Sequence, residues 1–199
     1  FVVAWRHGDP TLTNASIRQQ HYSGTGARIG GQVTVNTDAV RFKSDPDVAG
    51  LAAGRWVVVW TSKDQDGSGQ GVYSQRFEAT TGARLGSETR VPAVTADGQY
   101  HPAVAALPAG GYVVVWTSNG QDGSGSGIFM RRYDGKGAPA DGVIQVNTTK
   151  TNNQHDPEVA TLGKRDFVVV WTSDAQDLSG SGIYAQRFRL GIDAELPLH

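Results

Sequence analysis

Residues 112–133, YVVVWTSNGQDGSGSGIFMRRY, decide the fold of this chain because the same stretch recurs along it. A valine-rich run leads into tryptophan, a polar glycine-rich loop follows, and a second apolar run begins at Ile128. Similar stretches occupy residues 1–22, 56–77 and 167–188, so the copies begin 55, 56 and 55 residues apart. A fixed period of this size is the signature of a repeat architecture.

Each repeat is predicted to contain four strands. The first strands, which begin with proline, are predicted at residues 46–51, 102–107 and 157–162. Proline is tolerated at the first residue of a strand because its missing N–H costs least there. The second strand is the valine-tryptophan run, whose β-branched residues on both faces favour a buried strand over a helix. The third strands are predicted at residues 72–77, 128–133 and 183–188, and the short fourth strands at residues 33–37, 89–91 and 144–148.

A small sheet with an apolar central strand needs a neighbour on each face. Radial repetition meets that need, so we predict an all-β fold, a β-propeller of about four blades built from four-stranded repeats of about 55 residues. A β-sandwich is the alternative. We expect one domain over residues 1–199, with repeat units at about 1–45, 46–101, 102–156 and 157–199.

The first and last units are partial. A weak final strand is predicted around residues 192–196, after the last copy of the motif. We favour closure of four blades within one chain. A piece of a larger propeller and completion of the ring by a homo-oligomer are the alternatives.

The composition excludes several classes of partner. A net charge of −1 with a pI of about 6.6 leaves no electrostatic footprint for nucleic acid. The chain has no cysteine, so disulfides and cysteine-based zinc sites are excluded. No apolar run approaches the roughly 20 residues needed to cross a bilayer, so membrane insertion is not expected.

The pattern VVVWTSxxQDGSGxGIYxQRF, followed by VNTT and P-x-VA-x-L, resembles a tandem repeat of very large secreted bacterial proteins. Those are the calcium-associated adhesins and haemolysin-like proteins of type I secretion. The resemblance covers residues 56–188 well and residues 1–22 poorly. It implies a secreted, extracellular protein, and it implies no particular reaction.

The loop between the second and third strands carries candidate calcium ligands. These are Asp64, Asp66, Asp122, Asp174 and Asp177. Carboxylates among glycines supply the hard oxygen ligands that Ca²⁺ requires, although no copy has the spacing of a strong calcium loop. Calcium is the one cofactor that we expect.

A purely structural interpretation of these loops is favoured over calcium binding. The repeated aspartates, Asp66, Asp122 and Asp177, would then accept backbone N–H bonds and hold a hairpin turn. On this interpretation the arginines at matching positions, Arg76, Arg132 and Arg187, pair with them and lock the loop to the strand.

Two sets of aromatic residues recur. Tyr73, Phe129 and Tyr184 lie beside the glycine-rich loop and are the predicted ligand-binding residues, since aromatic rings stack on sugars. Trp5, Trp60, Trp116 and Trp171 occupy one position in the apolar strand. Because tryptophan buries so much area, we expect these four to pack one blade against the next.

We predict a non-enzymatic, extracellular binding or adhesion module for a glycan or another cell-surface ligand, as in a lectin with one similar site per blade. Repeated chemistry suits multivalent binding, whereas catalysis needs one asymmetric cluster. The alternative is a structural, calcium-stiffened segment of a larger secreted protein. The third hypothesis is a propeller glycoside hydrolase that uses unrepeated residues, for example Asp38, Asp97, His101 and Glu158.

Overall fold

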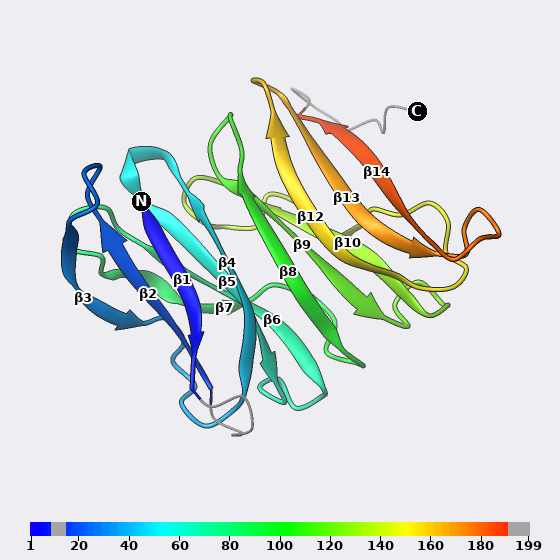
Figure 1. Ribbon diagram of the computed structural model, residues 1–199, viewed down its shortest axis with the longest axis horizontal. Helices are drawn as coiled ribbons and strands as arrows, with labels where there is room; N and C mark the ends of the chain where they lie inside the picture. Colours follow the sequence, from blue (N-terminus) through cyan, green and yellow to red (C-terminus); the bar gives the residue numbers. More distant parts are fainter. Residues whose placement is uncertain (9–14, 191–199) are drawn as a thin grey trace. The chain divides into compact units, whose positions relative to one another are not determined.

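The computed structural model describes residues 1–8 and 15–190, and almost all regular structure in them is β-strand (Figure 1). Contacts divide the chain into two compact units, Phe1–Tyr100 and His101–His199. Within the described residues, no helix is long and apolar enough to span a membrane.

The first unit contains two antiparallel sheets in chain order. One consists of β1 (Val2–His7), β2 (Ser16–Tyr22) and β3 (Arg28–Thr34). The other consists of β4 (Lys43–Gly50), β5 (Trp56–Lys63), β6 (Gln70–Phe77) and β7 (Arg84–Arg90). A short 3₁₀ turn, η1 (Ala52–Gly54), connects β4 to β5.

The second unit also contains two antiparallel sheets in chain order. One consists of β8 (Gln99–Ala106), β9 (Tyr112–Asn119), β10 (Ser126–Tyr133) and β11 (Ile144–Gln145). The other consists of β12 (Gln154–Leu162), β13 (Asp166–Asp174) and β14 (Ser181–Arg189). The first two residues of β8 precede the boundary between the units.

These sheets confirm the predicted all-β propeller fold with four blades built from the repeats. The first blade lacks its first strand, as the sequence indicated. The strand predicted around residues 192–196 lies outside the described residues. The single-domain organisation and the closure of the ring stay predictions.

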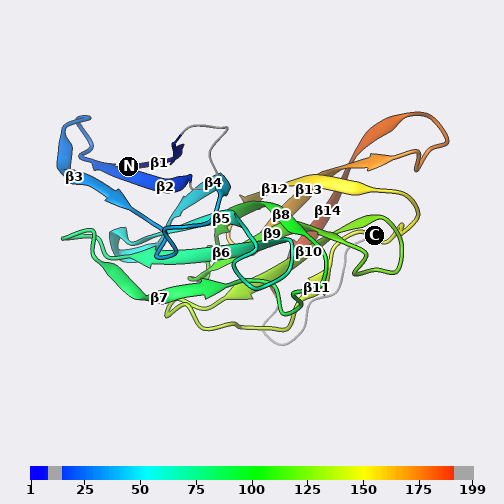
Figure 2. The same cartoon turned by 90° about the horizontal axis from the view of Figure 1, so that it is seen from below.

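The valine-tryptophan strands form the core, as predicted. Trp60 and Trp116 are fully buried, and Trp171 is 6% exposed. In the first unit, Trp60 belongs to the same apolar cluster as Ile17 of the neighbouring sheet. Figure 2 shows that sheet, β1–β3, lying against the sheet that starts at β4. Trp5, on the edge strand β1, is only partly buried.

The prolines of the first strands lie inside these strands, so their predicted place at the first residue was wrong. Strand β4 begins three residues before Pro46, which falls in a register shift between Ser44 and Asp47. Strand β12 has the same shift around Pro157. The extra residue of a bulge leaves a backbone position unpaired, so a proline without an N–H fits there.

The fourth strands begin earlier than predicted, at Arg28 in β3 and Arg84 in β7. The valines that indicated these strands, Val35 and Val91, follow the strand ends and are fully buried. Each still donates its backbone N–H to the third strand, to Ile17 O at 2.8 Å and to Val72 O at 2.9 Å. They anchor the end of the blade rather than forming its edge.

Candidate functional site

The aspartates at the tips of the three glycine-rich loops have one shared role in the structure. The Oδ1 atoms of Asp66, Asp122 and Asp177 accept the backbone N–H groups of Ser68, Ser124 and Ser179 at 3.3, 3.1 and 3.1 Å, respectively. Such a bond, two residues along the chain, is the Asx turn that aspartate forms readily. The structural interpretation of these residues therefore has direct geometric support.

The second oxygens of these carboxylates differ from loop to loop. Asp66 Oδ2 lies 3.8 Å from Arg90 Nη1, and Asp122 Oδ2 accepts a hydrogen bond from Gln145 Nε2 at 3.3 Å. In the third loop a different aspartate, Asp174 at the end of β13, accepts a hydrogen bond from the Ser181 hydroxyl through its Oδ1 at 2.7 Å. Over residues 1–8 and 15–190, no group of three or more His, Asp or Glu side chains is placed to hold a metal ion. Calcium binding at these loops, Asp64 included, stays a prediction.

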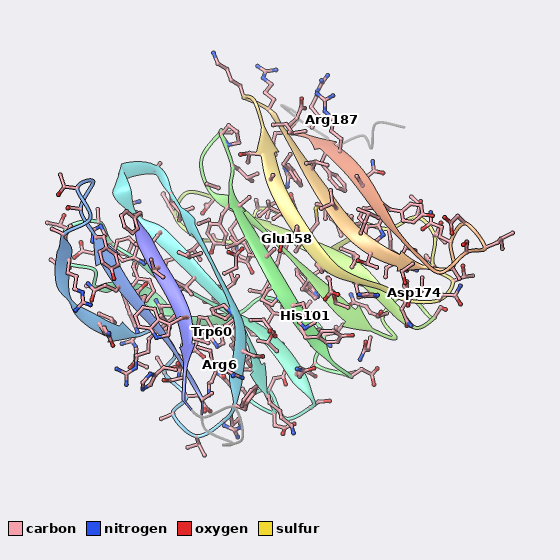
Figure 3. The ribbon with its side chains drawn as sticks, viewed as in Figure 1. Arg6, Trp60, His101, Glu158, Asp174 and Arg187 are labelled. Carbon is pink, nitrogen blue, oxygen red and sulfur yellow. The ribbon has the colours of Figure 1, made fainter. Side chains whose placement is uncertain are left out.

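The predicted pairing of arginines with the loop aspartates was wrong for two of the three arginines. Arg132 pairs with Asp141, and Arg187 pairs with Asp166. Figure 3 shows the reason, because Arg187 lies at the opposite end of its sheet from Asp174. With about 3.3 Å per residue, the arginine lies far along the strand from the loop that precedes it.

The predicted sugar-binding aromatics lie mostly in the core. Tyr73 is 6% exposed and Phe129 is 5% exposed, whereas Tyr184 is partly exposed. The ring of Tyr73 stacks on Trp60 with a centroid distance of 6.3 Å. Burial, together with the nearby carboxylate of Asp66, raises the pKa of Tyr73 to about 12. Neither Tyr73 nor Phe129 offers a ring face to a sugar, so the predicted role does not fit them.

A cluster of histidines and carboxylates joins β8 to β12 in the second unit (Figure 3). Asp156 lies between two imidazoles: one oxygen contacts His101 Nδ1, and the other lies 2.8 Å from His155 Nδ1. His155 Nε2 in turn lies 3.5 Å from Asp174 Oδ1. His101 and Asp156, which both precede a proline, have φ values of +48° and +51°; such values are uncommon outside glycine, although Asp and His adopt them more often than most residues.

The charges in this cluster stabilise each other. Burial lowers the pKa of His155, but hydrogen bonds to Asp156 and Asp174 outweigh that effect, and the net pKa is raised. Burial raises the pKa of Asp156, but hydrogen bonds from His155 and His101 outweigh it, and the net pKa is lowered. The contact between His155 and Asp156 therefore favours the charged form of both side chains.

The residues of the hydrolase hypothesis belong to both units, Asp38 and Asp97 to the first and His101 and Glu158 to the second, and that hypothesis stays a prediction. Asp38 follows β3 in the first unit and contacts the buried ammonium of Lys43 at 2.8 Å. Burial raises the pKa of Asp38, but hydrogen bonds from Lys43 and Arg41 hold it well below its ordinary value, which is unsuitable for a general acid. Asp97 precedes β8 with a φ of +62°, and Glu158 lies exposed on β12.

The first unit contains a cleft that the sequence analysis missed. Its volume is about 420 Å³, and nine residues from its two sheets and from the segments next to their strands line it: Phe1, Val2, His21, Val48, Gly50, Leu51, Gly54, Arg55 and Trp56. Aromatic rings form part of its wall, since His21 packs on Trp56 with centroids 5.0 Å apart and planes tilted by 46°. The Trp56 Nε1–H donates to Gln19 Oε1 at 2.7 Å, which fixes the indole in place.

The residues that open this cleft are peculiar to one repeat. Gly50 lies six residues before the aromatic that starts the second strand, and the corresponding residues of the later repeats are Ala106 and Thr161. Arg55 likewise corresponds to Gly111 and Asp166. A Cβ built on Gly50 would meet nothing within 4 Å, so the glycine leaves open space. These departures from the repeat pattern are the sequence signal that could have located the cleft.

Comparison with known proteins supports the fold but does not assign the chain to a family. No protein-family model matches the sequence, and no curated protein matches it. The resemblance to the repeats of type I-secreted adhesins therefore stays a prediction.

Several solved structures of propeller glycoside hydrolases are similar. An exo-1,5-alpha-L-arabinanase from a bovine ruminal metagenomic library superposes with a TM-score of 0.59 at 11% identity, over 100% of this chain and 74% of that chain. An endo-arabinase from Bacteroides thetaiotaomicron gives 0.54 at 13% identity, over 92% and 69%. A thermostable family-43 glycoside hydrolase gives 0.53 at 9% identity, over 93% and 71%. At such identities the likeness establishes the fold alone.

Proposed function

We propose that this chain is a non-catalytic carbohydrate-binding domain and that the cleft at Trp56 is its sugar site. The single observation that carries the proposal is the lining of the cleft, which combines the accessible rings of Phe1 and His21, the exposed guanidinium of Arg55 and two glycines. Its volume of about 420 Å³ falls in the range of ordinary small-molecule sites. Apolar ring faces with a few polar groups at the rim match the amphipathic surface of a sugar.

The similar structures support the same ligand class. Two of those named above are described as an endo-arabinase and an exo-1,5-alpha-L-arabinanase, and another similar structure is described as an endo-1,4-beta-xylanase. Binding without hydrolysis is proposed for this chain because two of its carboxylates already make other contacts. Asp38 forms ion pairs with Lys43 and Arg41, and Asp156 contacts the imidazoles of His101 and His155.

The proposal places one principal site in the first unit rather than one in every blade. Gly50 and Arg55 occur in one repeat, and the corresponding pairs are Ala106 with Gly111 and Thr161 with Asp166. We place the domain outside the cell, as the resemblance of its repeats implies. A calcium-stiffened spacer is the second candidate, and the three equivalent aspartate turns favour it.

A panel of immobilised oligosaccharides tests the proposal. The wild-type chain is expected to bind at least one of them without releasing new reducing ends. Gly50→Gln fills the cleft, so we expect it to abolish binding while the thermal unfolding temperature is kept. Gly31→Gln is the matched control, since a Cβ at Gly31 also meets open space on β3 but does not line the cleft. Binding that is equally lost in both variants, or that Gly50→Gln leaves intact, would refute the assignment of the site.

A further inference from the structure

We infer that the sugar bound at Trp56 is acidic, an oligosaccharide of uronic acids whose carboxylate pairs with Arg55; this rests on the proposed function of the same cleft. The charges of the lining carry the inference. Of the nine lining side chains, those of Arg55 and His21 are the ones that can be cationic, and none is a carboxylate. A negatively charged ligand complements this lining, whereas a neutral sugar offers no charge to pair with the Arg55 guanidinium.

Arg55 is available to a ligand. Its side chain is exposed and has no hydrogen-bond or ion-pair partner among the described residues. Its backbone is fixed, because its N–H donates to Ala52 O at 3.4 Å and its carbonyl accepts from Leu51 N–H at 2.6 Å. The guanidinium presents a planar fork of donors that matches a carboxylate in a bidentate arrangement.

The corresponding position in the last blade shows the contrast. Asp166 stands there in place of Arg55, and it already pairs with Arg187 and Arg189 of its own sheet. Arg132, at the repeat position of His21, is paired with Asp141. Those charges are paired within their own blades, so neither of these two positions carries an unpaired cation like that of Arg55.

The shape of the cleft places the sugar ring beside the cation. Gly50 and Gly54 lack side chains, and Gly54 has a φ of +68°, which lets the chain turn tightly between η1 and Arg55. A pyranose ring can therefore lie over the glycines beside the exposed ring of Phe1 and the partly exposed ring of His21, whereas Trp56 behind them is only 2% exposed. Its carboxylate then reaches the guanidinium at the rim.

Titration of the full chain with oligouronates tests this inference. The probes are trimers of galacturonate, mannuronate and guluronate, each compared with its carboxyl-reduced, neutral counterpart by calorimetry. We expect at least one acid to bind about tenfold or more tightly than its neutral counterpart. Arg55→Gln should remove that preference, and Lys63→Gln, the same change of charge at the far end of β5, should retain it.

The outcomes separate this inference from the proposed function. One outcome would support the cleft as a sugar site and contradict the inference of an acidic sugar. In that outcome neutral sugars bind as tightly as acidic ones, Gly50→Gln prevents binding, and Arg55→Gln has no effect. If no uronate binds, the inference is wrong. If no oligosaccharide of the wider panel binds either, the proposed function falls with it.

Discussion

The rings of Tyr112 and Tyr133 stack across β9 and β10, with centroids 4.7 Å apart and planes 9° from parallel. The same cross-strand pair recurs in every blade. The others are Phe1–Tyr22, Trp56–Phe77 and Phe167–Phe188, with centroid distances of 4.9, 5.6 and 5.1 Å. Each pair joins the start of the valine-tryptophan strand to the end of the next strand. The repeats thus keep an aromatic ring at both positions while its identity varies.

This stacking predicts how Tyr133 responds to substitution. Tyr133→Phe keeps the ring, so the free energy of unfolding should change by less than about 1.5 kcal/mol. Tyr133→Ala removes a buried ring and should cost about 3–5 kcal/mol. Urea unfolding of both variants gives the comparison. Equal losses would mean that the hydroxyl, rather than the ring, holds the two strands together.

The tryptophans of the central strands should differ according to burial. Trp116 is fully buried and Trp5 is partly exposed on an edge strand. Trp116→Ala should therefore lower the free energy of unfolding by about 3–5 kcal/mol, and Trp5→Ala by clearly less. Thermal unfolding followed by circular dichroism measures both. A larger loss for Trp5 would contradict the burial found here.

The Asx turn at Asp122 predicts a specific pattern of substitutions. Asp122→Asn retains an oxygen that accepts the Ser124 N–H, so its stability should be close to that of the wild type. Asp122→Ala removes the acceptor and should cost about 0.5–1.5 kcal/mol.

Calcium provides the second measurement on the same variants. Binding at the loops would raise the unfolding temperature in millimolar Ca²⁺, reversibly with EDTA, and Asp122→Asn would reduce that rise. If Ca²⁺ does not change the unfolding temperature of the wild type, the aspartates have only the structural role of holding the turn.

The contact between His155 and Asp156 predicts a dependence of stability on pH. The raised pKa of His155 adds stability below its unfolded value of about 6.5, and this is lost as the pH rises through the higher folded value. The lowered pKa of Asp156 adds stability above its unfolded value of about 3.9, and this is lost as the pH falls through the lower folded value. The contact therefore contributes most between about pH 4 and 6.5.

Asp156→Asn tests that window. Asparagine tolerates the positive φ at this position, so the change removes charge with little strain. The side chains are 31% and 54% exposed, so solvent limits the loss to less than about 1 kcal/mol at pH 5. The loss should shrink at pH 9 and in 1 M salt. A loss that is the same at pH 5 and pH 9 would rule out a charged contact.

The blades could be predicted from the sequence because their signal is periodic. The run from Val113 to Trp116 recurs at the 55- or 56-residue spacing, and its lack of polar residues required cover on both faces. The register shifts at Pro46 and Pro157 could not be predicted, because they depend on positive φ values at the preceding aspartates. A residue before proline ordinarily favours an extended conformation.

The sites were harder to predict because their residues come from different repeats. His101 and Asp156 are 55 residues apart, at the same position of successive repeats, and they meet because β8 and β12 belong to neighbouring blades. The cleft joins His21 to Arg55 across two sheets. Reasoning within one repeat finds turns such as that of Asp122, whereas contacts between repeats require the packing of the blades.

The prolines of β4, β8 and β12 have a consequence for this chain in concentrated solution. Each of these strands is the edge of its sheet, where free backbone groups invite pairing with another molecule. Near-identical repeats increase the risk of such intermolecular strand pairing, because every repeat contains the same kind of edge strand. Pro46, Pro102 and Pro157 remove a donor from each edge, and the bulges around Pro46 and Pro157 bend theirs away from a flat ladder. The repeats thus carry their own protection against fibril formation.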